Sequence, residues 1–254
     1  MIMSKLFSDL HVSPNISNGS SSISEIINMA FTLGFSYIGL SIFNRDNVDM
    51  IGDFKRMFNE HGIDMVSRVD LFPQNVNDLK RDLRFYRGKV EVISVFCNNI
   101  HVARFAARDS RVDVLNFSFS NWKSNFFDVS EAKLAAKGNS VLEINIADIL
   151  RCSNTGERIR TLRIMSENVR LALKYGVPVI ASSGAKNVFE MRDPRAMASI
   201  ITLLGVSEFD ALQFVSNNPS NLIERNRMKL SGEMVCKGVR LLGRVDDSGK
   251  NKEK

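Results

Sequence analysis

The sequence predicts an α/β fold, a single TIM-like (β/α) barrel with seven to eight parallel strands. Short runs rich in β-branched residues alternate with longer amphipathic stretches, which is the order of strands joined by helices in a parallel sheet. Most of the amphipathic stretches are followed by a glycine, a residue that often ends a helix. The length of 254 residues also matches the roughly 250 that such a barrel takes.

The first strand and helix are expected near the N-terminus. Residues 6–10 form the first predicted strand, and a polar loop rich in serine and asparagine follows it. Ser22 and Glu25 have the spacing of a capping box, in which each side chain accepts a hydrogen bond from the backbone amide of the other residue. The helix that they begin is expected to end at Gly34, and the second strand is expected over residues 37–43.

The same unit then recurs along the chain. Further strands are expected at residues 65–69, 90–96, 112–116, 141–146 and 177–181, with a short eighth strand at 215–217. Helices are expected at residues 48–60, 79–86, 100–108, 129–137, 157–175, 195–204 and 208–214. Gly138 is expected to end one of these helices, and Asp193 followed by Pro194 is a strong signal for the start of another. An open doubly wound sheet is the rival, but no GxGxxG or GxxxxGK[ST] motif supports its nucleotide-binding forms.

One domain is expected over residues 1–245, followed by a charged, disordered tail over residues 246–254 that lacks apolar anchors. No run of 18 or more apolar residues occurs, so no membrane span is predicted. The three cysteines, Cys97, Cys152 and Cys236, lie far apart and have no CxxC spacing. This usage argues against a disulfide framework or a zinc site and, without a signal-peptide pattern at the N-terminus, predicts a cytoplasmic protein.

Charge is divided unevenly along the chain. Residues 1–150 carry 16 Lys and Arg against 17 Asp and Glu, whereas residues 151–254 carry 18 against 11. The net charge of +6 therefore comes from the C-terminal part. Such a segment suits a polyanionic partner, because each phosphate that it neutralises releases a counterion. A basic surface that serves only solubility is the alternative.

A candidate site for chemistry lies at the end of the first strand. Asp9-Leu10-His11 resembles the opening of the polymerase-and-histidinol-phosphatase metal hydrolases, whose signature is Asp-Leu-His-x-His. An alternative function is therefore a metal-dependent phosphoesterase that uses Asp9, His11 and Glu143. Ser13 stands in place of the second signature histidine, and three histidines are too few for a site of two or three metals. We therefore predict no metal ligand and no catalytic residue, and expect Asp9 and His11 to be a hydrogen-bonded pair at the barrel mouth.

Basic residues of the C-terminal part are better candidates for binding. They fall in three clusters, on a long predicted helix, in the loop before the next helix, and near the C-terminus. Guanidinium groups and backbone amides of a helix start can converge on a phosphate. Any single one of these residues is more typical of a solvated surface, but three clusters in one basic segment favour nucleic-acid binding. The first cluster, in and just before the long predicted helix, is Arg151, Arg158, Arg160, Arg163, Arg170 and Lys174; the second is Lys186 and Arg192, and the third is Arg225, Arg227 and Lys229.

Short motifs in the C-terminal part match one known family in order and spacing. They are Ala181-Ser182-Ser183-Gly184-Ala185-Lys186, Glu190-Met191-Arg192-Asp193-Pro194, Leu204-Gly205-Val206-Ser207, Val215-Ser216-Asn217-Asn218 and Arg225-Asn226-Arg227. In these motifs the chain resembles the TIM-barrel protein subunit of archaeal and eukaryotic ribonuclease P, called protein component 3 in archaea. Weaker similarity extends over roughly residues 6–230 and includes Ser67-Arg68-Val69.

The resemblance implies a noncatalytic subunit of an RNA enzyme. In that family the RNA subunit removes the 5′ leader from precursor tRNA with Mg²⁺, so Mg²⁺ is expected for the catalytic RNA and no cofactor is expected on this chain. The implied partners are the ribonuclease P RNA, protein component 2 in a heterotetramer, other protein subunits and, indirectly, precursor tRNA, with no membrane. RNA contacts are expected at Arg68, Arg160, Arg163, Lys186, Arg192, Arg225 and Arg227.

Overall fold

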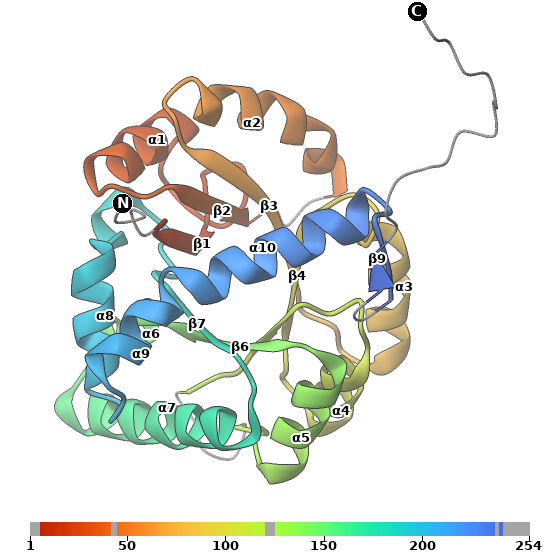
Figure 1. The fold of residues 1–254 in the computed structure, drawn as a ribbon. Coiled ribbons are helices and arrows are strands. Elements are labelled where there is room, and N and C mark those ends of the chain that lie inside the picture. Colours follow the sequence, from red (N-terminus) through yellow and green to blue (C-terminus); the bar gives the residue numbers. More distant parts are fainter. Residues whose placement is uncertain (1–5, 42–44, 120–124, 237–238, 241–254) are drawn as a thin grey trace, which may run out of the picture.

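Seven parallel strands, each hydrogen-bonded to its neighbours in chain order, form the centre of the computed structural model (Figure 1). The structure describes residues 6–41, 45–119, 125–236 and 239–240. The strands are β1 (Ser8–Val12), β2 (Tyr37–Ser41), β3 (Asp64–Leu71), β4 (Val92–Phe96), β5 (Val114–Asn116), β6 (Val141–Asn145) and β7 (Val179–Ser182). The prediction of a TIM-like α/β barrel is confirmed. The expected tail over residues 246–254, and the domain boundary at 245, lie outside the described residues.

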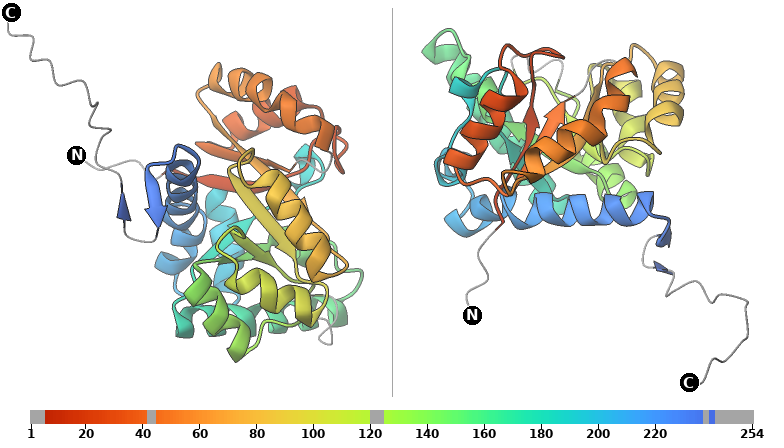
Figure 2. Two further views of the ribbon diagram at one scale, coloured as in Figure 1. Left: turned by 90° about the vertical axis from the view of Figure 1, so that its right-hand side faces the viewer. Right: turned by 90° about the horizontal axis from the view of Figure 1, so that it is seen from above.

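Helices surround the strands on the outside of the barrel (Figure 1, Figure 2). They are α1 (Ile23–Thr32), α2 (Ile51–Asn59), α3 (Val76–Tyr86), α4 (Ile100–Arg108), α5 (Val129–Gly138), α6 (Ile146–Leu150), α7 (Thr155–Tyr175), α8 (Pro194–Thr202), α9 (Glu208–Phe214) and α10 (Asn217–Leu230). Two 3₁₀ turns, η1 (Arg45–Met50) and η3 (Val188–Glu190), and a short antiparallel pair, β8 (Met234–Cys236) and β9 (Val239–Arg240), complete the described elements.

Alternation along each strand divides side chains between the barrel interior and the surrounding helices. On β3, Met65 and Val69 join the large core between strands and helices. The alternate positions, Val66, Arg68 and Asp70, face the interior. The interior is therefore apolar at the amino ends of the strands and polar toward their carboxyl ends. The apolar layer consists of Leu10, Val66, Val92, Val114, Val141 and Ile180.

Closure between β1 and β7 is incomplete, and among the described residues no eighth strand fills the gap. Val12 and Ala185 form one isolated parallel bridge, and the amide of Ser8 donates to the carbonyl of Val215 at 2.9 Å. The prediction of a strand at residues 215–217 is wrong, because Val215 ends α9 and Asn217 already begins α10. This segment is joined to β1 by one hydrogen bond, which the carbonyl of Val215 accepts. The described residues therefore form a seven-stranded, nearly closed barrel.

Several helix ends follow the local chemistry of the sequence, and the end of α5 does not. The capping box of Ser22 and Glu25 is present at the start of α1, and Asp193 caps α8 through two backbone amides. Gly138 does not end α5 as predicted, since Asn139 takes the left-handed conformation (φ 65°) instead. A Cβ on Gly138 would lie 2.0 Å from the carbonyl oxygen of Ala107. The glycine is therefore required by close packing of α5 on the last turn of α4.

Helix α10 closes the amino end of the barrel, and no part of it was expected from the sequence. In Figures 1 and 2 it runs across this end rather than alongside the strands. Leu222 and Ile223 pack against the apolar interior layer. The amide of the Asn226 side chain donates to the carbonyl of Glu91 at 2.9 Å, which fixes the helix to the barrel. The helix therefore covers the amino end of the barrel.

Shortening Ile223 to valine should test this closure. Ile223 is buried against the interior layer, and Ile223→Val is expected to lower the free energy of unfolding by about 0.5–1.5 kcal/mol. Urea unfolding followed by circular dichroism measures the change. The matched control is Asn221→Ala on the exposed side of α10, where a change within about 0.5 kcal/mol is expected. Equal effects of the two substitutions would contradict the packing described.

Candidate nucleic-acid interface

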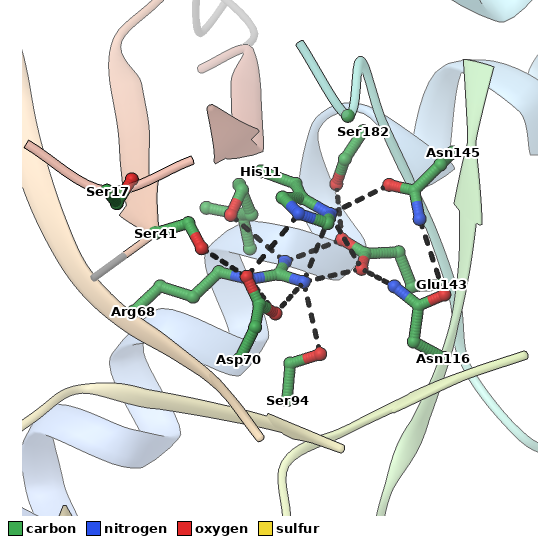
Figure 3. A network of polar contacts seen from close by, with 12 residues as sticks. His11, Ser17, Ser41, Arg68, Asp70, Ser94, Asn116, Glu143, Asn145 and Ser182 are labelled. Atoms are coloured by element: carbon green, nitrogen blue, oxygen red, sulfur yellow. Dashed lines mark hydrogen bonds and ion pairs between the residues drawn. The ribbon is translucent and has the colours of Figure 1, made fainter. Parts of the chain in front are cut away.

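Arg68 lies at the centre of a polar network inside the barrel (Figure 3). Its side chain is 0% exposed. Nη1 donates to Oε1 of Glu143 at 2.6 Å, and Nη2 donates to Oε2 of Glu143 at 2.6 Å and to Oδ1 of Asp70 at 2.7 Å. Further donations reach the carbonyl of Leu10 at 3.0 Å and Oγ of Ser94 at 3.1 Å. One guanidinium thus joins carboxylates of β3 and β6 across the interior.

Neighbouring strands supply donors for the remaining carboxylate lone pairs. Nδ2 of Asn116 and Oγ of Ser182 each donate to Glu143 at 2.7 Å, and Ser41 donates to Asp70. With Leu10 and Ser94, every strand from β1 to β7 contributes at least one group to the network. Such complete pairing is what a buried ion pair requires to be stable.

His11 enters the same network from β1. The pairing of β1 with β2 shifts register between Asp9 and Val12, and such irregularities re-aim side chains. Nδ1 of His11 lies 2.9 Å from Oδ1 of Asn145 and 3.3 Å from Oε2 of Glu143. Burial and Arg68 lower the pKa of His11, but Asp70 and Glu143 outweigh them, and the pKa is raised.

Electrostatics keep both carboxylates of the network ionised. Burial raises the pKa of Glu143, but Arg68 and His11 outweigh burial and hold this pKa well below the usual range. The same balance lowers the pKa of Asp70. Burial disfavours the charge of Arg68 as well, yet Asp70 and Glu143 raise its pKa further. The interior therefore carries an arginine that is permanently charged and permanently paired.

This geometry corrects the prediction that Arg68 contacts RNA. The guanidinium is fully buried, and all its edges already donate to groups of the barrel. A phosphate has no access to it, so the prediction is wrong. The sequence carried a signal for this role. On β3, every second position from Val66 to Asp70, including Arg68, lies on the face that points into the barrel.

The residues of the metal-hydrolase alternative do not fit a metal centre. Both oxygens of Glu143 are held by Arg68. Oδ1 of Asp9 accepts from the backbone amides of His11 at 3.3 Å and Ser183 at 3.0 Å, so the Asp9–His11 hydrogen bond runs through the backbone rather than between side chains. Among the described residues, no group of three His, Cys, Asp or Glu side chains is placed to hold a metal ion. The positive charge that a metal would bring is supplied by Arg68.

A cavity of about 450 Å³ opens at the carboxyl ends of the strands, beside the network. Its volume lies in the range of small-molecule sites. It is lined by aromatic side chains, by amide and acidic side chains, and by two cations. The residues that define it are Phe72, Phe96, Phe117 and Phe119, then Asn116, Asn145 and Asp148, then Arg151 and Lys186. Sequence reasoning missed Phe72 and Asp148 as candidates, whereas Arg151 belongs to the predicted basic cluster before and on α7.

Asp148 holds a carboxyl group in the wall of this cavity at an energetic cost. Burial raises its pKa from the ordinary 3.8 to about 6, although His11 and Arg151 act in the opposite sense. A folded-state pKa above the unfolded value gives stability that is complete below the unfolded pKa and is lost as the pH rises through the folded pKa. Stability from Asp148 should therefore disappear between pH 4 and pH 6, roughly.

Asp148→Asn is expected to remove this pH dependence. The variant cannot ionise, so it should exceed the unchanged chain in free energy of unfolding by up to about 3 kcal/mol at pH 8 and match it near pH 4. Urea unfolding at both pH values measures the difference. Asp49→Asn, at an exposed position of η1, is the control and should show no gain at pH 8. A constant difference at both pH values would contradict the burial of an ionised Asp148.

The remaining predicted RNA contacts lie on the outside of the molecule. Arg160 and Arg163 are exposed on α7, and Lys186 is exposed in the loop after β7. Arg192 is half-buried, and its Nη1 donates to the carbonyls of Phe189 and Met191 at 2.6 and 2.8 Å. One nitrogen of its guanidinium thus stabilises the loop that carries Arg192. RNA contact at these four positions stays a prediction.

Arg225 and Arg227 serve mainly to fix α10 to the barrel. Arg225 donates to the carbonyl of Asn139 at 2.6 Å and pairs with Asp113 at 3.4 Å. Arg227 pairs with Asp64 at 2.7 Å and with Glu91 at 2.6 Å. Both lie on α10, which crosses the amino end of the barrel (Figure 2), whereas Lys186 lines the cavity at the carboxyl ends of the strands. The structure gives them a stabilising role, and an RNA contact there stays a prediction.

Fold and site together define a TIM-like α/β barrel whose interior carboxylates are neutralised by its own arginine and whose outer helix α7 is basic. Sequence and structure comparisons agree with this class. A family described as RNase P subunit p30 matches residues 6–231. The chain belongs to this family.

Relatives named ribonuclease P protein component 3 extend over nearly the whole chain. The protein from Methanococcoides burtonii is 31% identical over 226 residues, 89% of this chain and 90% of its own length. The protein from Methanosarcina acetivorans is 29% identical over 214 residues, 84% of this chain and 87% of its own length.

Solved structures share the fold. A chain of archaeal ribonuclease P with mature tRNA, solved by cryo-electron microscopy, superposes with a TM-score of 0.78 at 18% identity, covering 93% of this chain and 99% of that one. Histidinol phosphate phosphatase from Lactococcus lactis gives a TM-score of 0.53 at 9% identity, covering 88% and 94%. In the described part of the chain, no helix is both long and apolar enough to cross a membrane.

Proposed function

We propose that this chain is a protein subunit of ribonuclease P that supports the catalytic RNA in removing the 5′ leader from precursor tRNA, without chemistry of its own. Membership of the RNase P subunit p30 family supports the proposal. So does the interior of the barrel, where the acidic groups of a candidate active site are occupied by Arg68. A subunit of this kind acts from its surface.

The observation that carries the RNA-binding role is the exposed face of α7. Arg160, Arg163, Arg170 and Lys174 recur at spacings of three, seven and four residues, which places them along one side of the helix. All four are exposed. In the described residues only Arg170 has an acidic partner, Glu167, at 3.8 Å. A helix with a row of exposed cations can follow a phosphate backbone, because each neutralised phosphate releases a counterion.

We also propose the partners that this role requires. The chain is expected to bind the ribonuclease P RNA directly, to contact precursor tRNA indirectly, and to pair with protein component 2 in a heterotetramer in the cytoplasm. Mg²⁺ belongs to the catalytic RNA in this proposal. Size-exclusion chromatography with light scattering on the mixed proteins tests the stoichiometry, and a mixture that elutes as separate monomers would contradict the heterotetramer.

Reconstitution tests the function. The cognate RNA, protein component 2 and this chain are combined, and the rate of 5′-leader removal is measured with and without the chain at a limiting Mg²⁺ concentration. The chain is expected to raise the rate, and the chain alone is expected to leave precursor tRNA intact. Hydrolysis of a generic phosphoester by the purified chain with added metal would support the metal-hydrolase alternative instead.

A further inference from the structure

The cavity at the barrel mouth has a feature that the proposed function does not explain. Asp148 lies in the first turn of α6, half-buried in the cavity wall. Within the described part of the chain, no donor forms a hydrogen bond to its carboxylate. A carboxylate that is partly removed from water and has no protein donor costs free energy. A ligand in the cavity that presents N–H groups can supply the missing hydrogen bonds.

The cavity is also lined by an aromatic platform. The rings of Phe72 and Phe96 are stacked, with centroids 4.3 Å apart and an angle of 17° between their planes. Phe72 is 48% exposed although it is a large apolar side chain at the rim of a cavity. Flat, partly exposed rings of this kind are the surfaces on which unstacked RNA bases lie.

Two cations stand at the edge of the same cavity. The Arg151 guanidinium is oriented by the carbonyl of Gly184 at 3.1 Å and by an ion pair with Glu190. Glu190 also accepts the backbone amide of Lys186 at 2.9 Å, so one carboxylate fixes the positions of both basic residues. The Lys186 side chain is exposed. The pair forms a site for a phosphate beside the platform.

Gly184 keeps this side of the cavity open. Its φ of +65° is a conformation that L side chains rarely adopt, and an added Cβ would lie 3.2 Å from the Asn145 side chain. A side chain here would press on Asn145 at the polar wall and move the carbonyl that orients Arg151. The turn at Gly184 thus keeps open the cavity that the aromatic side chains, Asp148 and the two cations line.

From these contacts we propose that the cavity binds one unstacked nucleotide of an RNA strand, with its base against Phe72, the edge of the base facing Asp148, and its phosphate at Arg151 and Lys186. The inference rests on the proposed RNA-binding function and specifies a site for it. A carboxylate accepts hydrogen bonds only. It therefore favours a base that presents N–H groups on its edge, and guanine presents two adjacent ones.

Short single-stranded RNAs test the site on the full chain. Fluorescence anisotropy at low salt compares labelled UUGUUU with UUUUUU, with a 12-base-pair RNA duplex as the ligand that cannot enter the cavity. Phe72→Ala is expected to weaken binding of UUGUUU by roughly fivefold or more, the loss of one base–aromatic stack. Asp148→Asn should remove the preference for UUGUUU over UUUUUU. Duplex binding should change in neither variant.

Phe31→Ala is the matched control, because Phe31 is 67% exposed on α1, outside the cavity. It should bind all three RNAs as the unchanged chain does, and thermal melting should show that every variant is folded. If Phe72→Ala behaves like Phe31→Ala, or no hexamer binds, the nucleotide site is wrong. If the chain still raises the rate of leader removal in that case, the proposed function stands. If the unchanged chain does not raise the rate of leader removal, that result would instead contradict the proposed function.

Ultraviolet crosslinking to the cognate RNA provides an independent readout. Mass spectrometry of the digested complex is expected to find a nucleotide attached to the peptide that contains Phe72. Crosslinks confined to peptides of α7 would place the RNA on the outer surface only and overturn the inference.

Discussion

Arg68→Met is expected to lower the free energy of unfolding at pH 7 by about 3–5 kcal/mol, the usual cost of removing one partner of a buried ion pair. The substitution would leave Glu143 and Asp70 buried without the guanidinium that holds both ionised. Their pKa values would then rise, because burial disfavours the charged forms. Urea unfolding followed by circular dichroism measures the loss.

The pH dependence of this loss separates a charge effect from a packing effect. In the unchanged chain both carboxyl pKa values are lowered, so the stability that they contribute is present at neutral pH and is lost as the pH falls through them. In Arg68→Met these groups can take up protons more readily. The difference between the two proteins should therefore narrow below about pH 4. Arg163→Met, at an exposed position of α7, is the control, and an equal loss in it would refute the role of the network.

Arg160→Ala combined with Arg163→Ala is expected to weaken binding of the chain to its RNA and to slow leader removal. Two phosphate contacts fewer should reduce the slope of log affinity against log salt concentration by about 2. The free energy of unfolding should stay within about 0.5 kcal/mol, since both side chains are exposed. Filter binding between 50 and 200 mM salt, roughly the range in which such contacts show their effect, provides the measurement.

The matched control for this pair is Arg56→Ala with Arg81→Ala. These arginines are also exposed on helices, α2 and α3, but they lie in the part of the chain that has no excess of positive charge. The control should keep the full salt dependence. A slope that falls equally in both pairs would show nonspecific attraction to the whole surface rather than binding along α7.

Strands and outer helices were predictable from the sequence because local signals and tertiary packing agree there. Real helix ends or starts are marked by the Ser22 capping box, the Asp193 cap and most of the glycines, with Gly138 as the exception. Helix α10 escaped prediction because its apolar contact is narrow, chiefly Leu222 and Ile223, and its ends lack strong signals. The proposed eighth strand failed for a related reason, since its residues belong to the turn that leads into this helix.

Function was predictable where motifs cluster in sequence and not where residues meet only in space. The basic residues of α7 are close neighbours along one helix, so their common face could be read directly. Arg68 seemed available for RNA because its partner Glu143 lies 75 positions away. The cavity joins Phe72 after β3, Asp148 in α6 and Lys186 after β7, and no sequence spacing relates them. Only the closed barrel brings these residues together.

The most direct test of a supporting role is the Mg²⁺ dependence of leader removal. The Mg²⁺ concentration for half-maximal cleavage of precursor tRNA by the cognate RNA is measured with protein component 2 alone and with component 2 plus this chain. Addition of the chain is expected to lower that concentration, because cations on the protein replace part of the Mg²⁺ that the folded RNA needs. An unchanged concentration, or cleavage by the chain in the absence of the RNA, would contradict the proposed role.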